Sequence, residues 1–238
     1  MISRKNIMIF DFLINIIDYK NKLKILNILK NKFNQNLINV IDIGGHKGET
    51  INFFLKNFNI DKIYVFEPNH QLYETLIKKF TNQNTFIFNY GVGFQNEKKN
   101  LNISINSASS TINKINTNTN YYKRKKKFLA LGKKKPYFIG TQEIDIINLS
   151  EFLLSKENKI DILKIDTEGY EFNILKGISK EDFKKIKLIY FEHHYDLMIE
   201  KGYKFSDINN LLKINNFTLK YKLRMKFRKS FEYIYESN

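Results

Sequence analysis

The residues whose types and spacing most clearly suggest chemistry lie between positions 42 and 48. An acidic residue, Asp42, closes an apolar run and is followed by glycines in the pattern D-x-G-x-x-x-G. Glycine at such a turn lets the backbone approach a ligand closely and adopt positive φ. The pattern differs from the G-x-G-x-x-G of dinucleotide folds, because Asp42 stands where the first glycine would be. A carboxylate there repels a pyrophosphate but suits a ligand with ammonium and sulfonium charges, such as S-adenosylmethionine (SAM).

A second acidic residue, Glu67, follows the next apolar run, 25 residues after Asp42. Nucleotide-binding α/β folds place an acid at about this distance to bind ribose hydroxyls. The alternative is that Glu67 starts a helix and interacts with its dipole. Together with the glycine turn, Glu67 predicts a SAM pocket.

A third acidic group, Asp166, Glu168 and Glu171, follows the apolar run 160–165. Open α/β sheets bind ligands at the carboxyl edge of their strands, where Asp166 is expected to lie. Helix capping explains one or two of these acids but not the whole group.

Transfer of a methyl group from a sulfonium is an in-line displacement that depends mainly on positioning, and a general base can take the proton of an acceptor hydroxyl. Candidate bases are Asp166, Glu192 and His193. Adjacent strand residues point to opposite faces, so at most one of His193 and His194 faces the cleft, and His193 is favoured. A divalent metal on Asp166, Glu192 and His193 is conceivable. No ligand spacing demands it, so no metal ligand is predicted.

These residues follow apolar runs that predict strands, at 39–43, 62–66, 84–89, 160–165 and 187–191. Helices are expected after the glycine turn to about residue 56, over 69–80, and after each of the last two strands. This alternation predicts a doubly wound α/β domain with a mostly parallel sheet covered on both faces. The runs 217–221 and 225–235 have no helix between them, which predicts an antiparallel C-terminal pair.

Two segments lie outside this rhythm. Apolar spacing near the N-terminus predicts an amphipathic helix, so residues 1–36 are expected to be a helical extension of a domain at 37–238. Residues 94–140 are polar and contain a lysine-rich insertion near 112–138, with basic runs at 123–127 and 133–135. The favoured interpretation is a solvated, partly mobile insertion. The alternative is a substrate-facing flap that attracts anionic groups such as phosphates or sugar acids.

Composition narrows the function classes. The 238 residues include no cysteine, which excludes disulfides and thiolate chemistry. The net charge is +16, but 36 of the 40 basic residues are lysine, which shares A/T-rich codons with the abundant Asn and Ile. Nucleic-acid readers favour arginine, so compositional drift is favoured and a nucleic-acid partner is not expected. Without a membrane-length apolar run or a signal-peptide cleavage site, the protein is expected to be cytoplasmic.

Several stretches together resemble the FkbM family of SAM-dependent methyltransferases, over roughly residues 38–195. They are VIDIGGHKGET, VFEPN, NYGVG, SASST and IDILKIDTEGYEFNILKG, followed by IYFEHH. The resemblance implies a Rossmann-like class I methyltransferase fold with SAM as the methyl donor. By position, it implies cofactor contacts from Asp42, Gly44, Gly45, His46, Gly48, Glu67, Pro68, Asn89, Gly91 and Asp166, and acceptor contacts from Ser109, Ser110 and Glu168. One departure is Asn148-Leu149-Ser150, where family members usually have Thr-Leu-Asp.

The resemblance implies O-methylation of a hydroxyl on a sugar, glycan or related small molecule, consistent with a role in glycan biosynthesis. One alternative is an RNA methyltransferase that uses the lysine run as a phosphate track. The N-P-P-Y-type signature of amine methylation is absent from the sequence. Another alternative is a non-catalytic protein that binds SAM or anions. The acceptor, any metal requirement and the oligomeric state stay open.

Overall fold

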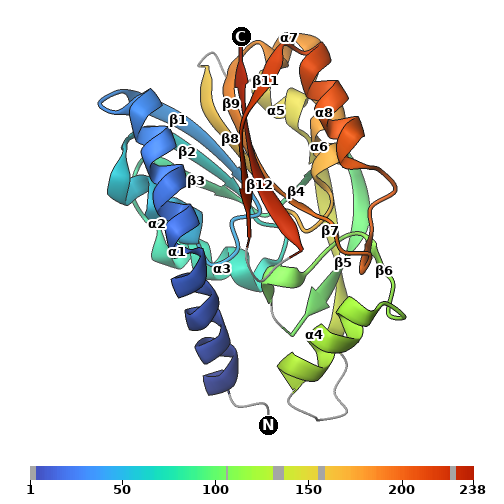
Figure 1. Cartoon of the computed structure of the whole chain (residues 1–238). Helices are drawn as coiled ribbons and strands as arrows, with labels where there is room; N and C mark the ends of the chain where they lie inside the picture. Colours follow the sequence, from blue (N-terminus) through green and yellow to red (C-terminus); the bar gives the residue numbers. More distant parts are fainter. Residues whose placement is uncertain (1–3, 106, 131–136, 155–158, 226–228) are drawn as a thin grey trace.

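A seven-stranded sheet forms the centre of the computed structural model, which describes residues 4–105, 107–130, 137–154, 159–225 and 229–238 (Figure 1). The strand order is β11-β12-β9-β8-β1-β2-β3. The strands are β1 (Leu37–Ile43), β2 (Asn59–Phe66), β3 (Thr85–Phe88), β8 (Ile160–Ile165), β9 (Ile186–His194), β11 (Phe217–Arg224) and β12 (Ser230–Ser237). The strands β1, β2, β3, β8 and β9 run parallel to one another, and β12 is antiparallel to both β9 and β11. The predicted fold class is therefore confirmed.

Helices cover both faces because the strands bury apolar side chains on both. On one face lie α1 (Arg4–Phe33), α2 (Glu49–Asn57) and α3 (His70–Lys79), through buried residues such as Leu29, Phe54 and Leu76. On the other lie α5 (Leu149–Leu154), α6 (Glu171–Lys176), α7 (Lys180–Phe183) and α8 (Phe205–Ile214). None of the helices in the described part of the chain is long and apolar enough to cross a membrane.

The N-terminal helix α1 packs on the sheet through side chains one helical turn apart. Ile25, Leu29 and Phe33 are buried in the same apolar cluster as Val40 of β1. This spacing fits the amphipathic helix that the sequence predicts. The division into an extension of residues 1–36 and a domain of residues 37–238 stays a prediction.

The middle of the chain is more ordered than the favoured interpretation of the sequence predicted. β4 (Gly91–Gly93), β5 (Glu97–Ser104) and β7 (Phe138–Asn148) form a separate sheet in the order β4-β7-β5. Between β5 and β7 come a short 3₁₀ helix, η1 (Ser107–Ser109), then β6 (Lys114–Ile115) and α4 (Asn120–Ala130). β6 pairs with β10 (Ile199–Glu200), which follows β9. The basic run at 123–127 therefore lies on a packed helix, and the run at 133–135 lies outside the described residues.

The C-terminal hairpin forms as predicted, but its second strand begins later than expected. The backbone N–H of Met225 donates to the carbonyl oxygen of Ser230 at 3.1 Å, which closes the turn between β11 and β12. β12 then pairs with β9 from Ser230 onward, opposite His194. This pairing places β12 beside the carboxyl end of β9, next to the candidate site.

Candidate active site

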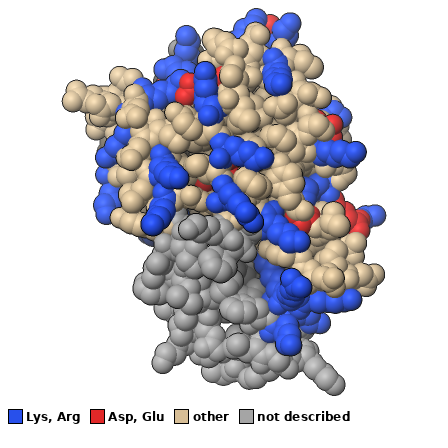
Figure 2. Space-filling model, in the orientation of Figure 1, with Lys and Arg blue, Asp and Glu red and all other residues tan. Residues whose placement is uncertain are grey.

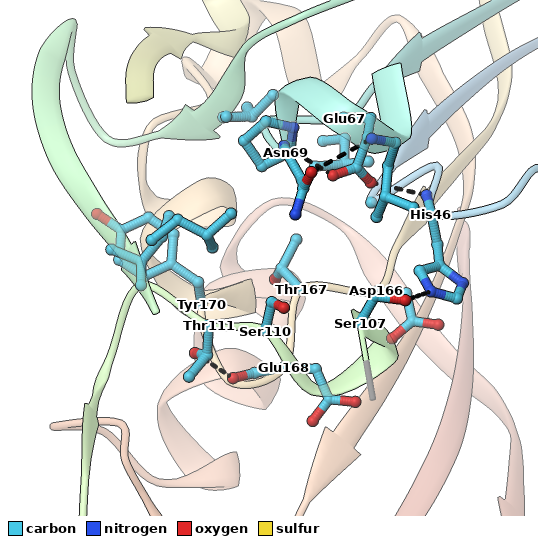
Figure 3. Close-up of a pocket in the computed structure, with 18 of the residues that line it drawn as sticks. His46, Glu67, Asn69, Ser107, Ser110, Thr111, Asp166, Thr167, Glu168 and Tyr170 are labelled. Carbon is cyan, nitrogen blue, oxygen red and sulfur yellow. Dashed lines mark hydrogen bonds between the residues drawn. The ribbon is translucent and has the colours of Figure 1, made fainter. Parts of the chain in front are cut away.

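A pocket of about 630 Å³ lies at the carboxyl ends of β1, β2 and β8 (Figure 3). Its wall includes Gly44 after β1, Glu67 after β2 and Asp166 after β8. The segment after β5 supplies Ser110 and Thr111 to the same wall. This edge of the sheet is the one predicted from the sequence.

The turn after β1 needs glycine because two strands approach each other there. Gly44 has a φ of +95°, and a Cβ at this position would lie 2.0 Å from the carbonyl oxygen of Asp166. The N–H of Asp166 donates to the carbonyl oxygen of Ile43 at 2.9 Å, while the N–H of Gly44 donates to Phe66 at 2.9 Å. Backbone contacts thus fix the turn against both neighbouring strands.

Glu67 is held rigidly at the pocket wall. Its two carboxylate oxygens accept backbone N–H groups of His46 at 2.7 Å and Asn69 at 2.8 Å. Burial raises the pKa of Glu67 to about 7, although these hydrogen bonds oppose the rise. Each carboxylate oxygen can accept a further donor, so Glu67 can receive two hydroxyl groups of a ligand.

Asp42 lies beneath the pocket and does not line it. The side chain is fully buried, and its Oδ1 lies 3.6 Å from Nζ of Lys164. Burial raises the pKa of Asp42 to about 6, against the attraction of Lys164. Lys164 also donates to Oδ2 of Asp166 at 3.3 Å. Asp42 is therefore placed to act on the pocket through Lys164 and Asp166 rather than by direct contact.

The turn after β8 is strained and anchored from the middle of the chain. Glu168 has a φ of +52°, which is uncommon for a residue other than glycine. Its carbonyl oxygen accepts Oγ1 of Thr111 at 2.9 Å, and the carbonyl oxygen of Gly169 accepts Nδ2 of Asn113 at 2.6 Å. Figure 3 draws this hydrogen bond from the hydroxyl of Thr111 to the carbonyl oxygen of Glu168.

Glu171 supports this turn from inside the fold. It is fully buried, and its Oε1 accepts the N–H of Gly169 at 2.8 Å and the hydroxyl of Thr167 at 3.2 Å. Its Oε2 accepts the hydroxyl of Tyr203 at 2.6 Å. Both oxygens of Glu171 are thus used structurally, which leaves Asp166 and Glu168 as the acids of this group at the pocket wall.

The two histidines at the end of β9 lie in different surroundings, and the expectation that His193 faces the cleft is wrong. His193 packs against the rings of Tyr195, Tyr203 and Phe205, and burial lowers its pKa to about 4. His194 instead turns toward Glu168, with Nε2 3.6 Å from Oε2. Strand geometry makes neighbouring residues face opposite sides of the sheet, but it does not determine which of the two faces the pocket.

His194 is surrounded by carboxylates. Its Nε2 lies 3.7 Å from Glu192 and its Nδ1 lies 3.6 Å from Asp196. Burial alone would lower the pKa of His194, but Glu168, Glu192 and Asp196 outweigh it and raise the pKa to about 10. At neutral pH His194 is therefore an imidazolium that balances negative charge.

The structure brings most, but not all, of the predicted site residues to the pocket wall. Those at the wall are Gly44, His46, Glu67, Pro68, Gly91, Ser110, Asp166 and Glu168. Those away from it are Asp42, Gly45, Gly48, Asn89, Ser109, Glu192 and His193. Asn89 shapes the wall indirectly, since its Nδ2 donates to the carbonyl oxygens of Glu67 and Pro68.

Sequence reasoning missed several residues of the site. Tyr90 and Thr111 line the pocket, and Lys125 of α4 donates to Oγ of Ser109 at 2.8 Å. Tyr90 directly follows the strand that the sequence predicts at 84–89, so its position at a strand end was a usable signal. Nothing in the sequence singled out Lys125 from the other lysines of its run. Within the described residues, no group of three or more His, Asp or Glu side chains is arranged to hold a metal ion.

Comparison with known proteins assigns the family. A family model described as the methyltransferase FkbM domain matches residues 42–219, from the end of β1 to β11. The chain belongs to the FkbM methyltransferase family. The search of curated proteins found no match to the sequence of this chain.

Solved structures agree on the fold. Methyltransferase FkbM from Methylobacillus flagellatus KT is similar with a TM-score of 0.51 and 14% identity, over 84% of this chain and 44% of that one. The chain thus spans less than half the length of that protein. Magnesium protoporphyrin IX methyltransferase from Synechocystis PCC 6803, solved with SAM, has a TM-score of 0.51 and 10% identity, over 94% and 82% of the two chains.

A third similar structure is TrmK from M. capricolum in complex with S-adenosylhomocysteine. It has a TM-score of 0.50 and 13% identity, over 90% of this chain and 67% of that one. The comparisons confirm the expected family and the class I methyltransferase fold, and they agree with SAM as the cofactor. They leave the acceptor open.

Proposed function

We propose that this protein is a SAM-dependent O-methyltransferase that acts on a hydroxyl of a sugar, glycan or related small molecule. The observation that carries the proposal is one pocket in which Glu67 lies on one side and Asp166 and Glu168 on the other (Figure 3). The cofactor would supply an electrophilic methyl group on a sulfonium. The chain's own residues would bind it, orient the acceptor and receive a proton.

The pocket suits the cofactor in three respects. Gly44 lets the turn after β1 pack against the backbone of Asp166, which places both turns at the pocket wall. Glu67 offers free acceptor sites to ribose hydroxyls. Asp166 and Glu168 supply negative charge for a ligand with positive groups.

The wall near the β8 turn suits a polyhydroxylated acceptor. Ser110, Thr111 and Thr167 bring hydroxyl groups to it, beside the carboxylates of Asp166 and Glu168. Such groups donate to and accept from sugar hydroxyls.

A carboxylate, rather than a histidine, is the better candidate for the general base. His194 already carries its proton at neutral pH, and His193 does not reach the wall. Burial raises the pKa of Glu168, which brings this base closer to the operating pH, while His194 and Lys125 counter the rise. Asp166 is the second candidate, since it lines the same wall.

Calorimetric titration of SAM and a methyl-transfer assay on a panel of sugars and glycans test the proposal. Glu67→Ala should abolish saturable SAM binding, whereas Glu181→Ala, at an exposed site on α7, should leave it unchanged. Glu168→Gln should keep SAM binding and lower kcat by about 10²-fold or more if Glu168 is the base. Folded wild-type protein that does not bind SAM would rule out the proposal. If the protein methylates RNA and none of the sugars or glycans, the acceptor in this proposal is wrong and RNA takes its place.

A further inference from the structure

The middle of the chain has a charge distribution that compositional drift does not explain. Residues 98–142 contain eleven lysines and arginines and no aspartate or glutamate, so all 24 acidic residues lie elsewhere. Drift toward A/T-rich codons adds lysine along the whole chain, but it does not remove acids from one segment. In Figure 2, basic side chains gather at the lower right, where Figure 1 places α4.

The positive charge of α4 is not neutralised within the fold. Across the part of the chain that the structure describes, none of the ion pairs involves residues 123–127. Lys123, Arg124 and Lys127 are exposed. Their charge is therefore available to a partner with negative charge.

Packing holds α4 next to the pocket rather than free in solvent. Tyr122 of α4 is buried with Tyr137, Met198 and Ile199. The strand before α4 is fixed to the segment after β9, since Ile115 pairs with Ile199. The position of the basic helix is thus set by the same segment that follows His194.

One lysine of α4 turns inward to the site. Nζ of Lys125 donates to Oγ of Ser109 and lies 5.6 Å from the ring centre of Tyr137. Its charge also acts on Glu168, which lines the pocket. Lys125 therefore brings one positive charge of α4 close to the wall that carries Glu168.

We propose that α4 recognises the methyl acceptor through a phosphate group that the acceptor carries: the inward-facing Lys125 contacts the phosphate, and the exposed Lys123, Arg124 and Lys127 attract it from the outer face of the helix. This inference rests on the proposed transferase function and names its substrate class, a phosphorylated sugar. Phosphate suits the site because it carries more charge than a carboxylate, and lysine binds it as a point charge. The presence of only one arginine among the residues 120–130 of α4 argues against RNA as the occupant.

The test is calorimetric binding at low ionic strength to the protein saturated with S-adenosylhomocysteine. Probes are inorganic pyrophosphate, glucose 1-phosphate, glucose, glucuronate and bulk tRNA. Wild-type protein should bind pyrophosphate and glucose 1-phosphate, and should bind glucose and glucuronate more weakly by about tenfold or more. Added salt should weaken phosphate binding.

Variants locate the site. Lys125→Gln, and separately the triple change Lys123→Gln, Arg124→Gln and Lys127→Gln, should each weaken phosphate binding by about tenfold or more and leave cofactor affinity intact. The matched control removes three exposed lysines elsewhere, by Lys56→Gln, Lys180→Gln and Lys213→Gln. It should bind phosphate like the wild type.

Several outcomes would overturn the inference. The wild type would fail to bind pyrophosphate, or it would bind glucuronate as tightly as glucose 1-phosphate. Alternatively, the control variant with three substituted lysines would lose as much phosphate affinity as the α4 variants. Binding and methylation of tRNA, without sugar phosphates, would assign α4 to a nucleic acid instead. If the cofactor itself does not bind, the transferase proposal fails. If the cofactor binds and phosphate selectivity is absent, only the role of α4 fails.

Discussion

At the residue scale, the carboxylates of the site are distinguished by what surrounds them. Glu67 accepts the backbone N–H groups of His46 and Asn69, and burial raises its pKa to about 7. Glu168 faces two cationic groups, His194 and Lys125. The same residue type is therefore suited to hydroxyl recognition on one wall and to proton acceptance on the other.

Cofactor binding should depend on the ionisation of Glu67. Because only the ionised carboxylate offers all its acceptor sites, affinity for S-adenosylhomocysteine should fall as pH drops from 8 to 6.5, through the pKa of about 7. Calorimetry across this range measures the effect. Glu67→Gln should bind more weakly and show a flatter profile, and a flat wild-type profile would contradict the role given to Glu67.

At the element scale, the middle of the chain and the β8 turn form one unit. Thr111 and Asn113 bind the carbonyl oxygens of Glu168 and Gly169, and β6 pairs with β10. The strained backbone of Glu168 is thus held by partners from 55 or more residues earlier in the chain. Acceptor-side geometry depends on these cross-connections rather than on the turn alone.

Asn113→Ala should loosen this unit. Losing the bond to Gly169 should lower the free energy of unfolding by about 1 kcal/mol and reduce methyl transfer further, because the strained turn relaxes. Urea unfolding and hydrogen exchange at residues 167–170 measure both effects. Asn118→Ala, at an exposed site in the same segment, is the control and should match the wild type. Unchanged exchange at the turn in Asn113→Ala would contradict the anchoring.

At the scale of the whole molecule, a cluster of buried charges lies along one end of the central sheet. It includes Asp42 on β1, Lys164 on β8, and Glu192 and His194 on β9, together with the half-buried Glu232 on β12. Acids outnumber bases, so the imidazolium of His194 contributes to folding as well as to the site. Stability and site electrostatics are therefore coupled.

Stability should fall at alkaline pH because of His194. The pKa of His194 is 6.5 in the unfolded chain and about 10 in the folded protein. Its contribution to the free energy of unfolding is therefore complete below pH 6.5 and is lost as the pH rises through 10. Urea unfolding between pH 6.5 and 10 should show this decline in the wild type and in His70→Gln, a control at an exposed histidine. His194→Gln should be less stable at pH 6.5 and decline less. An equal decline in His194→Gln would refute the assignment.

The fold was predictable where burial on both faces leaves continuous apolar runs, as in 160–165 of β8. β5 and β7 were not predicted because many of their outward residues are polar or charged, so the segment resembled a solvated insertion. Ile144 and Ile146 alternate with Asp145 and were the readable sign of a half-buried strand.

For the site, motifs identified strand ends correctly but not side-chain direction. Asp42 and His193 both end or follow apolar runs, yet neither lies at the pocket wall. One residue along a strand reverses the face, and spacing alone does not fix which face meets the ligand. Lys125 was hidden among like residues because only tertiary packing turns it inward.

The absence of acids from residues 98–142 also governs how the chain is cut. A protease that cleaves after glutamate finds sites at Glu97 and Glu143 and none between them, so it releases α4, η1 and both flanking strand segments in one peptide. Trypsin divides the same stretch at every accessible lysine. A photoreactive acceptor analogue attached anywhere along this surface would therefore be recovered as a single mass, and its position read by a second digestion with trypsin.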